Sequence, residues 1–417
     1  MNKKLIYISS VGGSLEFFDF MIFVHLYPVI IDKFFPPSDN NLQKTFLTIL
    51  TFIISYISKP FGGIFYGIIG EKFGVIKSFN STLLIISIST LCITFLPTYK
   101  EIGVFSTILL ILFRILQGFS NGGEIPSSVI YTYENSNEKE KYLSCLFFAF
   151  TIGSCIAAYL ATIFTNFKDI LGENIYYRFP FLIGGFLSFF AFFIRKKFTS
   201  TISFSKKDRF KFIYSFKNLK THSKFIFIYG FGSTLMANYF ILTPSIYLNK
   251  YYQSNHSIKF IISISLLLIA IFTLINAFFV TKYNFKQLYS IGIILNIFFS
   301  PIYFFLINSK NEYYFITAQI IASIICAPIF GNIYSIICNN LKNNLILNFS
   351  IISNLSVTIF PPITSSIIIF LISLNRTYLP SVLVSIYGIS VLVLILKQKL
   401  FTQVNERTQN DILNRSV

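Results

Sequence analysis

The stretch Phe113–Pro126, FRILQGFSNGGEIP, decides both the fold class and the candidate site. It lies inside a run from Ile102 to Tyr133 that is otherwise apolar enough to cross a lipid bilayer. Four polar side chains interrupt this run and fall within roughly 80° of one another on a helix of about 100° per residue. They are Arg114, Gln117, Asn121 and Glu124. A charge near the centre of a bilayer costs about 2.5 kcal/mol or more, so this stripe should face a bundle interior or a watered cavity.

The stripe carries a cation at one end and a carboxylate at the other, about 15 Å apart at a rise of about 1.5 Å per residue. We expect Arg114, Gln117 and Asn121 of the stripe, together with Lys59 of an earlier apolar run, to bind a substrate. Gly118 and Gly122 lie one helical turn apart and should let a neighbouring helix come close. The structural alternative is that Arg114 and Glu124 only hold helices together.

The whole chain has the composition of a membrane protein. Of its 417 residues, 54% are hydrophobic and 12% are charged, and a soluble protein would carry about twice that charged share. Apolar runs of about 20 residues recur from end to end, which predicts an all-α polytopic membrane protein with twelve transmembrane helices in two six-helix bundles. The expected spans are about 5–31, 46–69, 78–97, 103–133, 142–166, 179–194, 222–248, 259–281, 286–308, 312–338, 345–373 and 378–396.

A basic loop divides the chain. Residues 195–224 hold ten of the Lys and Arg residues and a single acid, and basic loops mark the cytoplasmic side of a membrane. An even number of spans then places both termini in the cytoplasm. Because Glu16 and Asp19 interrupt the first apolar run, it should be a retained helix and not a cleaved signal peptide. The expected parts are an N-terminal bundle (1–195), a linker (196–221), a C-terminal bundle (222–397) and a cytoplasmic tail (398–417).

Several classes of function are not favoured. The net charge of +18 is concentrated in loops at membrane edges, which argues against a nucleic-acid partner. The five cysteines are scattered through apolar runs without metal or redox spacing, and no nucleophile–base pair stands at suggestive spacing. We therefore expect no metal, no cofactor and no enzymatic activity.

The first span carries SLEFFDF, in which Glu16 and Asp19 lie about 60° apart on one helix face. Two carboxylates that share a low-dielectric space resist ionising together, so one of them can exchange a proton near neutral pH. We expect Asp19, Glu16 or Glu124 to couple protons, with a slight preference for Asp19. The alternative is that Glu16 and Asp19 both pair with Lys59 and Arg114. No ionisable residue of the second half lies at comparable depth, so that half should offer hydrogen bonds and aromatic surface.

The second span ends in KPFGGIFYGIIGEKFGVIK, residues 59–77. Its glycines allow close helix packing, and a carboxylate at its end can sit at the positive N-terminus of another helix and latch a gate. We expect such a gate motif at Gly67, Gly70, Glu71, Lys72, Gly74 and Lys77.

The order of LEFFDF, KPFGG, GIIGEKFG, RILQGFSNGGE and YRFPF, over roughly residues 10–185, resembles the metabolite:proton symporter branch of the major facilitator superfamily. Bacterial proline/betaine transporters are familiar members. The resemblance implies two six-helix bundles, alternating access and proton-driven uptake in a bacterial inner membrane. It places the gate motif on the family's signature loop, with the carboxylate of Glu71 pointing to residues 343–345, and Arg114, Gln117 and Gly118 on its fourth-helix motif.

Three positions depart from the family pattern: Lys59 and Val75 stand where Arg is usual, and Glu71 where Asp is usual. We expect a monomeric, proton-coupled symporter for a small zwitterion such as proline or betaine. A dicarboxylate substrate is the alternative within that class, since two buried cations could hold two carboxylates. A membrane sensor descended from a transporter is the alternative outside it, because Val75 removes a loop cation.

Overall fold

The computed structural model describes residues 3–37, 41–199, 219–244, 255–309, 311–341, 343–374 and 376–414. Within these ranges the ordered elements are helices. The first half contains α1 (Lys3–Phe34), α2 (Asn41–Phe73), α3 (Val75–Phe95), α5 (Val104–Asn135), α6 (Lys139–Asn166) and α8 (Arg178–Thr199), with the short helices α4 (Tyr99–Ile102) and α7 (Lys168–Leu171). The second contains α10 (Leu219–Leu235) with its π-helical continuation η1 (Met236–Ile241), α12 (Asn255–Phe279), α13 (Phe285–Asn308), α14 (Glu312–Cys338), α15 (Leu345–Ser373) and α16 (Leu379–Asn414).

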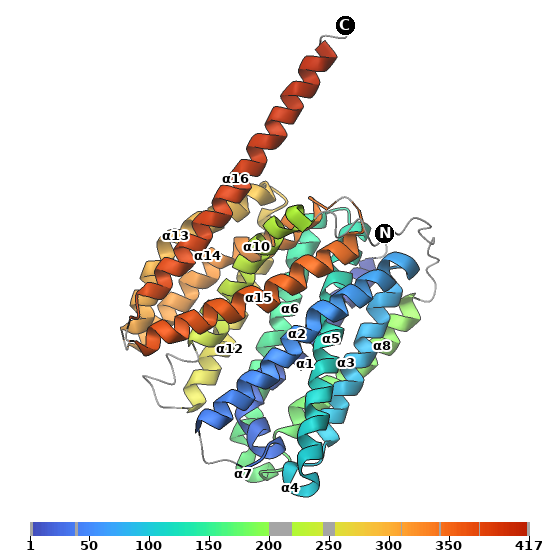
Figure 1. Cartoon of the computed structure of the whole chain (residues 1–417), viewed down its shortest axis with the longest axis vertical. Coiled ribbons are helices and arrows are strands. Elements are labelled where there is room, and N and C mark those ends of the chain that lie inside the picture. Colours follow the sequence, from blue (N-terminus) through green and yellow to red (C-terminus); the bar gives the residue numbers. More distant parts are fainter. Residues whose placement is uncertain are drawn as a thin grey trace.

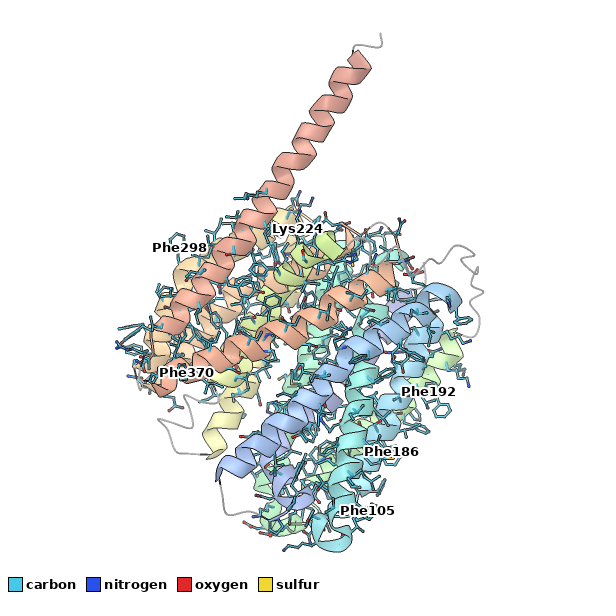
Figure 2. The ribbon with its side chains drawn as sticks, viewed as in Figure 1. Phe105, Phe186, Phe192, Lys224, Phe298 and Phe370 are labelled. Atoms are coloured by element: carbon cyan, nitrogen blue, oxygen red, sulfur yellow. The ribbon has the colours of Figure 1, made fainter. Side chains whose placement is uncertain are left out.

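The long helices make a multi-pass membrane protein. Eleven of them are long and apolar enough to cross a bilayer. The twelfth long helix, α2, has 33 residues and packs along α5. Large apolar side chains project from the outer surface of the bundle, among them Phe105, Phe186, Phe298 and Phe370, which are each more than half exposed (Figure 2). Lipid is the medium that suits such a surface.

The two halves meet along a few helices. In Figure 1, α2 and α15 run side by side, and α6 packs against α12 and α14 behind them. The start of α1 and the end of α16 lie at the same end of the bundle (Figure 1), as an even number of spans requires. The cytoplasmic identity of that end stays a prediction.

Two boundaries differ from those expected from the sequence. Helix α8 continues through Thr199, past the expected end of the first bundle at residue 195, and α16 continues through Asn414, into the expected tail 398–417. Most of the expected linker 196–221 lies outside the described residues. The division of the chain into domains therefore stays a prediction.

The glycines of α5 bring this helix against α2, as predicted. A Cβ atom on Gly118 would lie 2.1 Å from the carbonyl oxygen of Ser55, and one on Gly122 would lie 2.1 Å from that of Lys59. No side chain fits at such distances, so glycine at both positions allows the two backbones to touch. This contact fixes Lys59 of α2 beside Asn121 of α5.

Candidate functional site

A cavity of about 130 Å³ lies between the two halves. Its walls come from α1, α2, α5 and α6 of the first half and from α10, η1, α14 and α15 of the second. A water molecule needs about 10–15 Å³ measured in this way, so the space can hold a small organic solute or several waters. Its polar lining includes Tyr56, Lys59, Asn121, Tyr229, Ser233 and Asn354.

Lys59 is the cation that lines this cavity, and it is 6% exposed. Its Nζ atom lies 4.0 Å from the ring centre of Phe20 and 4.5 Å from that of Tyr56. The ion pairs among the described residues do not include Lys59. Asn121 lines the same cavity, and no group in the described ranges donates to its Oδ1 atom. Two of the four predicted substrate-binding residues therefore meet in one place.

Aromatic rings form much of the remaining wall. Phe147 of α6 stacks on Phe330 of α14 with ring centres 5.1 Å apart and planes 7° from parallel. Phe150, Tyr229 and Tyr334 extend this surface. The described residues that line the cavity include no carboxylate. In the described part of the second half, the buried polar residues include no Asp, Glu, Lys or Arg, as the sequence predicted.

The other two predicted substrate-binding residues lie deeper in the first half. Arg114 is fully buried and does not line the cavity. It donates from Nη1 to Oε1 of Gln117 at 2.9 Å, and its guanidinium carbon lies 3.8 Å from the ring centre of Phe23. Gln117 in turn donates to Thr90 of α3 at 2.9 Å. The stripe on α5 is long enough that its members face different neighbours: Asn121 faces the cavity, whereas Arg114 faces α1.

Asp19 lies away from the cavity. Its Oδ2 atom accepts a hydrogen bond from Ser188 of α8 at 2.8 Å, and Gly184 leaves the space for its other oxygen. Asp19 is 1% exposed and does not line the cavity.

Glu16 is fully buried, and no donor in the described ranges reaches either of its oxygens. Its charged neighbours are Glu124, Lys59, Arg195 and Asp19. The alternative in which Glu16 and Asp19 pair with Lys59 and Arg114 finds no such ion pair among the described residues.

Arg195 is the residue that the sequence interpretation missed. We assigned it to the basic loop; that assignment is wrong, because α8 extends to Thr199 and the side chain of Arg195 is fully buried. Its Nη2 atom lies 2.6 Å from Oε1 of Glu124, and its Nη1 atom lies 3.0 Å from Oε2. Thr82 also donates to Glu124. The counter-ion of Glu124 thus comes from another helix and not from Arg114 on its own helix.

The gate motif joins α2 to α15. Oε1 of Glu71 accepts a hydrogen bond from the backbone N–H of Ile346, in the first turn of α15, at 2.9 Å. This contact lies one residue beyond the expected range 343–345. A Cβ atom on Gly67 would lie 2.9 Å from Cα of Leu347, and one on Gly70 would meet the side chain of Ile346 at 2.6 Å, so both glycines permit the approach.

The turn after the gate helix also depends on glycine. Gly74 has φ 93°, a conformation that residues with a side chain rarely adopt, and it separates α2 from α3. Lys72 and Lys77 are exposed beside it, and Nζ of Lys77 lies 4.6 Å from the ring centre of Phe73. Val75, where the family usually has Arg, is buried in the apolar core.

The sequence profile of the Major Facilitator Superfamily matches residues 10–343, so the chain belongs to this superfamily. The proton:xylose symporter XylE, bound to 6-bromo-6-deoxy-D-glucose, superposes with a TM-score of 0.74 at 13% identity over 94% of each chain. The human organic anion transporter MFSD10 gives 0.69 at 11% identity over 94% of this chain and 99% of the other. At these identities the likeness shows the fold alone.

Relatives with higher sequence identity match this chain over only part of their length. A putative proline/betaine transporter of Staphylococcus aureus (strain COL) is 35% identical over 198 residues, which are 47% of this chain and 42% of that protein. The glycine betaine/proline/ectoine/pipecolic acid transporter OusA of Dickeya dadantii (strain 3937) is 29% identical over 286 residues, 63% of this chain and 56% of that one. The chain thus spans roughly half the length of these relatives.

Proposed function

We propose that this protein is a proton-coupled symporter for a small zwitterion with a carboxylate and a fully substituted or secondary ammonium group, such as betaine or proline. The observation that carries the proposal is the lining of the cavity. One cation and an aromatic wall face it, and no carboxylate among the described residues does. The names of the relatives point to the same class of solute.

Each end of a zwitterion has a matching surface. The solute carboxylate would pair with Lys59 and accept from the amide of Asn121. The ammonium group would lie against the rings of Phe147 and Phe330, since cations bind aromatic faces with about 0.5–2 kcal/mol. A dicarboxylate would need a second cation at the cavity, and Arg114 lies behind Phe20 and Phe23.

The proton would be carried by a carboxyl group of the first half. Among Glu16, Asp19 and Glu124, we favour Glu16. Asp19 accepts from Ser188 and faces α8, whereas Glu124 is held by Arg195. Glu16 has no hydrogen-bond donor in the described ranges and is an electrostatic neighbour of Lys59 in the cavity wall.

Transport itself would follow alternating access between the two halves in a bacterial inner membrane, with a single chain as the working unit. The contact between Glu71 and Ile346 would close the gate at the predicted cytoplasmic end. Release of this contact would open the cavity to that side.

The test is uptake by proteoliposomes under an imposed pH gradient, with betaine, proline and succinate as solutes. We expect accumulation of the zwitterions and no accumulation of succinate. Phe330→Ala should weaken betaine uptake about 2- to 30-fold, since about 1.4 kcal/mol corresponds to a factor of about ten. The matched control is Phe186→Ala on the lipid-facing surface. Accumulation of succinate alone would favour the dicarboxylate alternative, and zwitterion binding without uptake would favour the sensor.

A further inference from the structure

Proline deprives two backbone carbonyl groups of the first half of a donor from their own helix. A proline has no N–H, so the carbonyl oxygen four residues before it lacks the hydrogen bond that an α-helix would otherwise supply. Pro60 of α2 frees the carbonyl oxygen of Tyr56 in this way. Pro126 of α5 frees that of Gly122. Tyr56 lines the cavity, and Gly122 follows the lining residue Asn121, so both acceptors belong to the surroundings of the cavity.

Both freed acceptors are served by α15 of the other half. Nδ2 of Asn354 donates to the carbonyl oxygen of Gly122 at 2.8 Å. The hydroxyl of Thr358 donates to the carbonyl oxygen of Tyr56 at 3.0 Å. The two donors are one helical turn apart and lie on one face of α15. The helix that runs beside α2 in Figure 1 is thus tied, at the level of the cavity, to two helices of the first half.

Glycine makes room for the longer of the two donors. Asn354 is 4% exposed and itself lines the cavity. A Cβ atom on Gly63 of α2 would lie 2.3 Å from Nδ2 of Asn354 and 3.2 Å from the carbonyl oxygen of Gly122. The amide of Asn354 therefore reaches α5 by passing α2 at a position that has no side chain.

Another freed carbonyl group shows the same chemistry inside one half. Pro301 of α13 frees the carbonyl oxygen of Ile297, which accepts a hydrogen bond from Ser385 of α16 at 2.9 Å. Because α13 and α16 belong to the same half, this bond can persist while the halves move. The bonds of Asn354 and Thr358 cross from one half to the other, so they must break whenever α15 moves away from α2 and α5.

The crossing bonds lie on the same segment of α15 as the gate contact. Ile346, which donates to Glu71, precedes Thr358 by about 18 Å at a rise of about 1.5 Å per residue. Pro361 and Pro362 follow shortly after Thr358, and prolines are the usual places where helices bend. A bend there would carry the gate contact and both crossing bonds away from the first half together.

We propose that proline in α2 and α5 keeps two carbonyl groups free for α15, and that Asn354 and Thr358 are positioning residues whose hydrogen bonds to these groups hold the cavity closed at the gate end. A carbonyl group that is already bonded within its helix has little to offer a partner. A freed one binds α15 when the halves meet and water of the opened cavity when they part, so the contact is reversible. This proposal rests on the movement of the two halves in the proposed function and not on the identity of the solute.

The experiment measures how often the gate end opens. The readout is the rate at which a water-soluble thiol reagent modifies the buried Cys338 when the other cysteines are replaced, with the full-length protein in lipid nanodiscs and without solute. Asn354→Leu should raise this rate about two- to tenfold, the factor that corresponds to one ordinary hydrogen bond. In Pro126→Ala the backbone of residue 126 regains its N–H and serves Gly122 within α5. In that background Asn354→Leu should change the rate by less than about twofold.

A second pair and a matched control complete the cycle. Thr358→Val removes one hydroxyl group and should behave in the same way with Pro60→Ala. In the crossed pair, Asn354→Leu with Pro60→Ala, the single effects should multiply, because these residues share no hydrogen bond. Ser385→Ala is the control, with and without Pro301→Ala, and should leave the rate unchanged because its bond stays inside one half.

Two outcomes overturn the proposal. One is an effect of Asn354→Leu that is equally large with proline and with alanine at residue 126. The other is an unchanged labelling rate in both Asn354→Leu and Thr358→Val. If Asn354→Leu does not fold, the milder cycle of Thr358→Val with Pro60→Ala decides alone. Because labelling needs no solute, failure of the crossing bonds leaves zwitterion uptake standing, and failure of zwitterion uptake leaves the crossing bonds standing.

Discussion

Arg195 holds Glu124 with two nitrogen atoms, at 2.6 Å and 3.0 Å, and its guanidinium occupies the space that a side chain on Gly12 would fill. The contact joins α8 to α5 across α1. Arg195 also contacts Phe79 of α3 in two ways. The ring centre of Phe79 lies 3.4 Å from the guanidinium carbon, and the backbone carbonyl oxygen of Phe79 accepts a hydrogen bond from Nη1 at 2.6 Å. Four helices of the first half are therefore fixed by one buried charge pair.

Removing one member of this pair should destabilise the protein more than removing both. A buried charge left without its partner costs about 3–5 kcal/mol, whereas apolar replacement of a whole pair is often neutral. We expect Arg195→Met and Glu124→Met each to lower thermal stability in detergent strongly, and the double variant to regain most of the loss. A double variant no more stable than the worse single variant would contradict the assigned pairing.

Gly12→Ala should disturb the same pair without touching either charged residue. A Cβ atom at this position would lie 1.6 Å from Nη2 of Arg195, so the guanidinium must move away from Glu124. Hydrogen bonds to charged groups contribute about 1.5–3 kcal/mol, and we expect a loss of stability in that range. Val11→Ala, at the exposed neighbouring residue, is the matched control. Equal melting temperatures for the two variants would contradict this prediction, because they would show that Arg195 can adopt another conformation without loss of stability.

Glu71→Gln should weaken the gate. A carboxylate at a helix N-terminus contributes about 0.3–1 kcal/mol, and up to about 2 kcal/mol when partly buried, so the open and closed states should shift several-fold. The native Cys338, the last residue of α14, is fully buried. It can report opening of the gate when the other cysteines are replaced. We expect faster modification of Cys338 by a water-soluble thiol reagent and little change in solute affinity.

The control for the gate variant is Glu138→Gln, which removes an exposed acid between α5 and α6. An affinity loss in Glu71→Gln with unchanged labelling of Cys338 would mean that Glu71 contacts the solute and is no latch.

The orientation of the protein in the membrane can be tested at the two ends of α6. Glu138 is exposed just before this helix and Ile170 is 77% exposed just after it, in α7. On a cysteine-free background, a cysteine at residue 170 should react with an impermeant reagent in intact cells, and one at residue 138 should react only after the membrane is opened. The reverse pattern would invert the topology that the basic loop predicts.

The linear sequence determined which segments cross the membrane, because an apolar run of about 20 residues leaves few other ways to satisfy its backbone in lipid. It also indicated functional roles for Lys59, Asn121 and Glu71. Charged and polar side chains inside apolar helices cost free energy, so they are expected mainly where they serve a site or a contact. In each case the signal lies in one segment and its period, and needs no knowledge of the neighbouring helix.

The partners of these residues were decided by the tertiary structure alone. A helix wheel gives the direction of a side chain and not what stands opposite it, so Arg114 and Asn121 share a stripe yet face α1 and the cavity respectively. Arg195 stands in a basic run at the end of an apolar segment, where its sequence context equals that of a loop cation. Only the packing of α8 against α1 and α3 buries it and brings it to Glu124 of α5, because the free energy of a buried charge depends on groups that are distant in the chain.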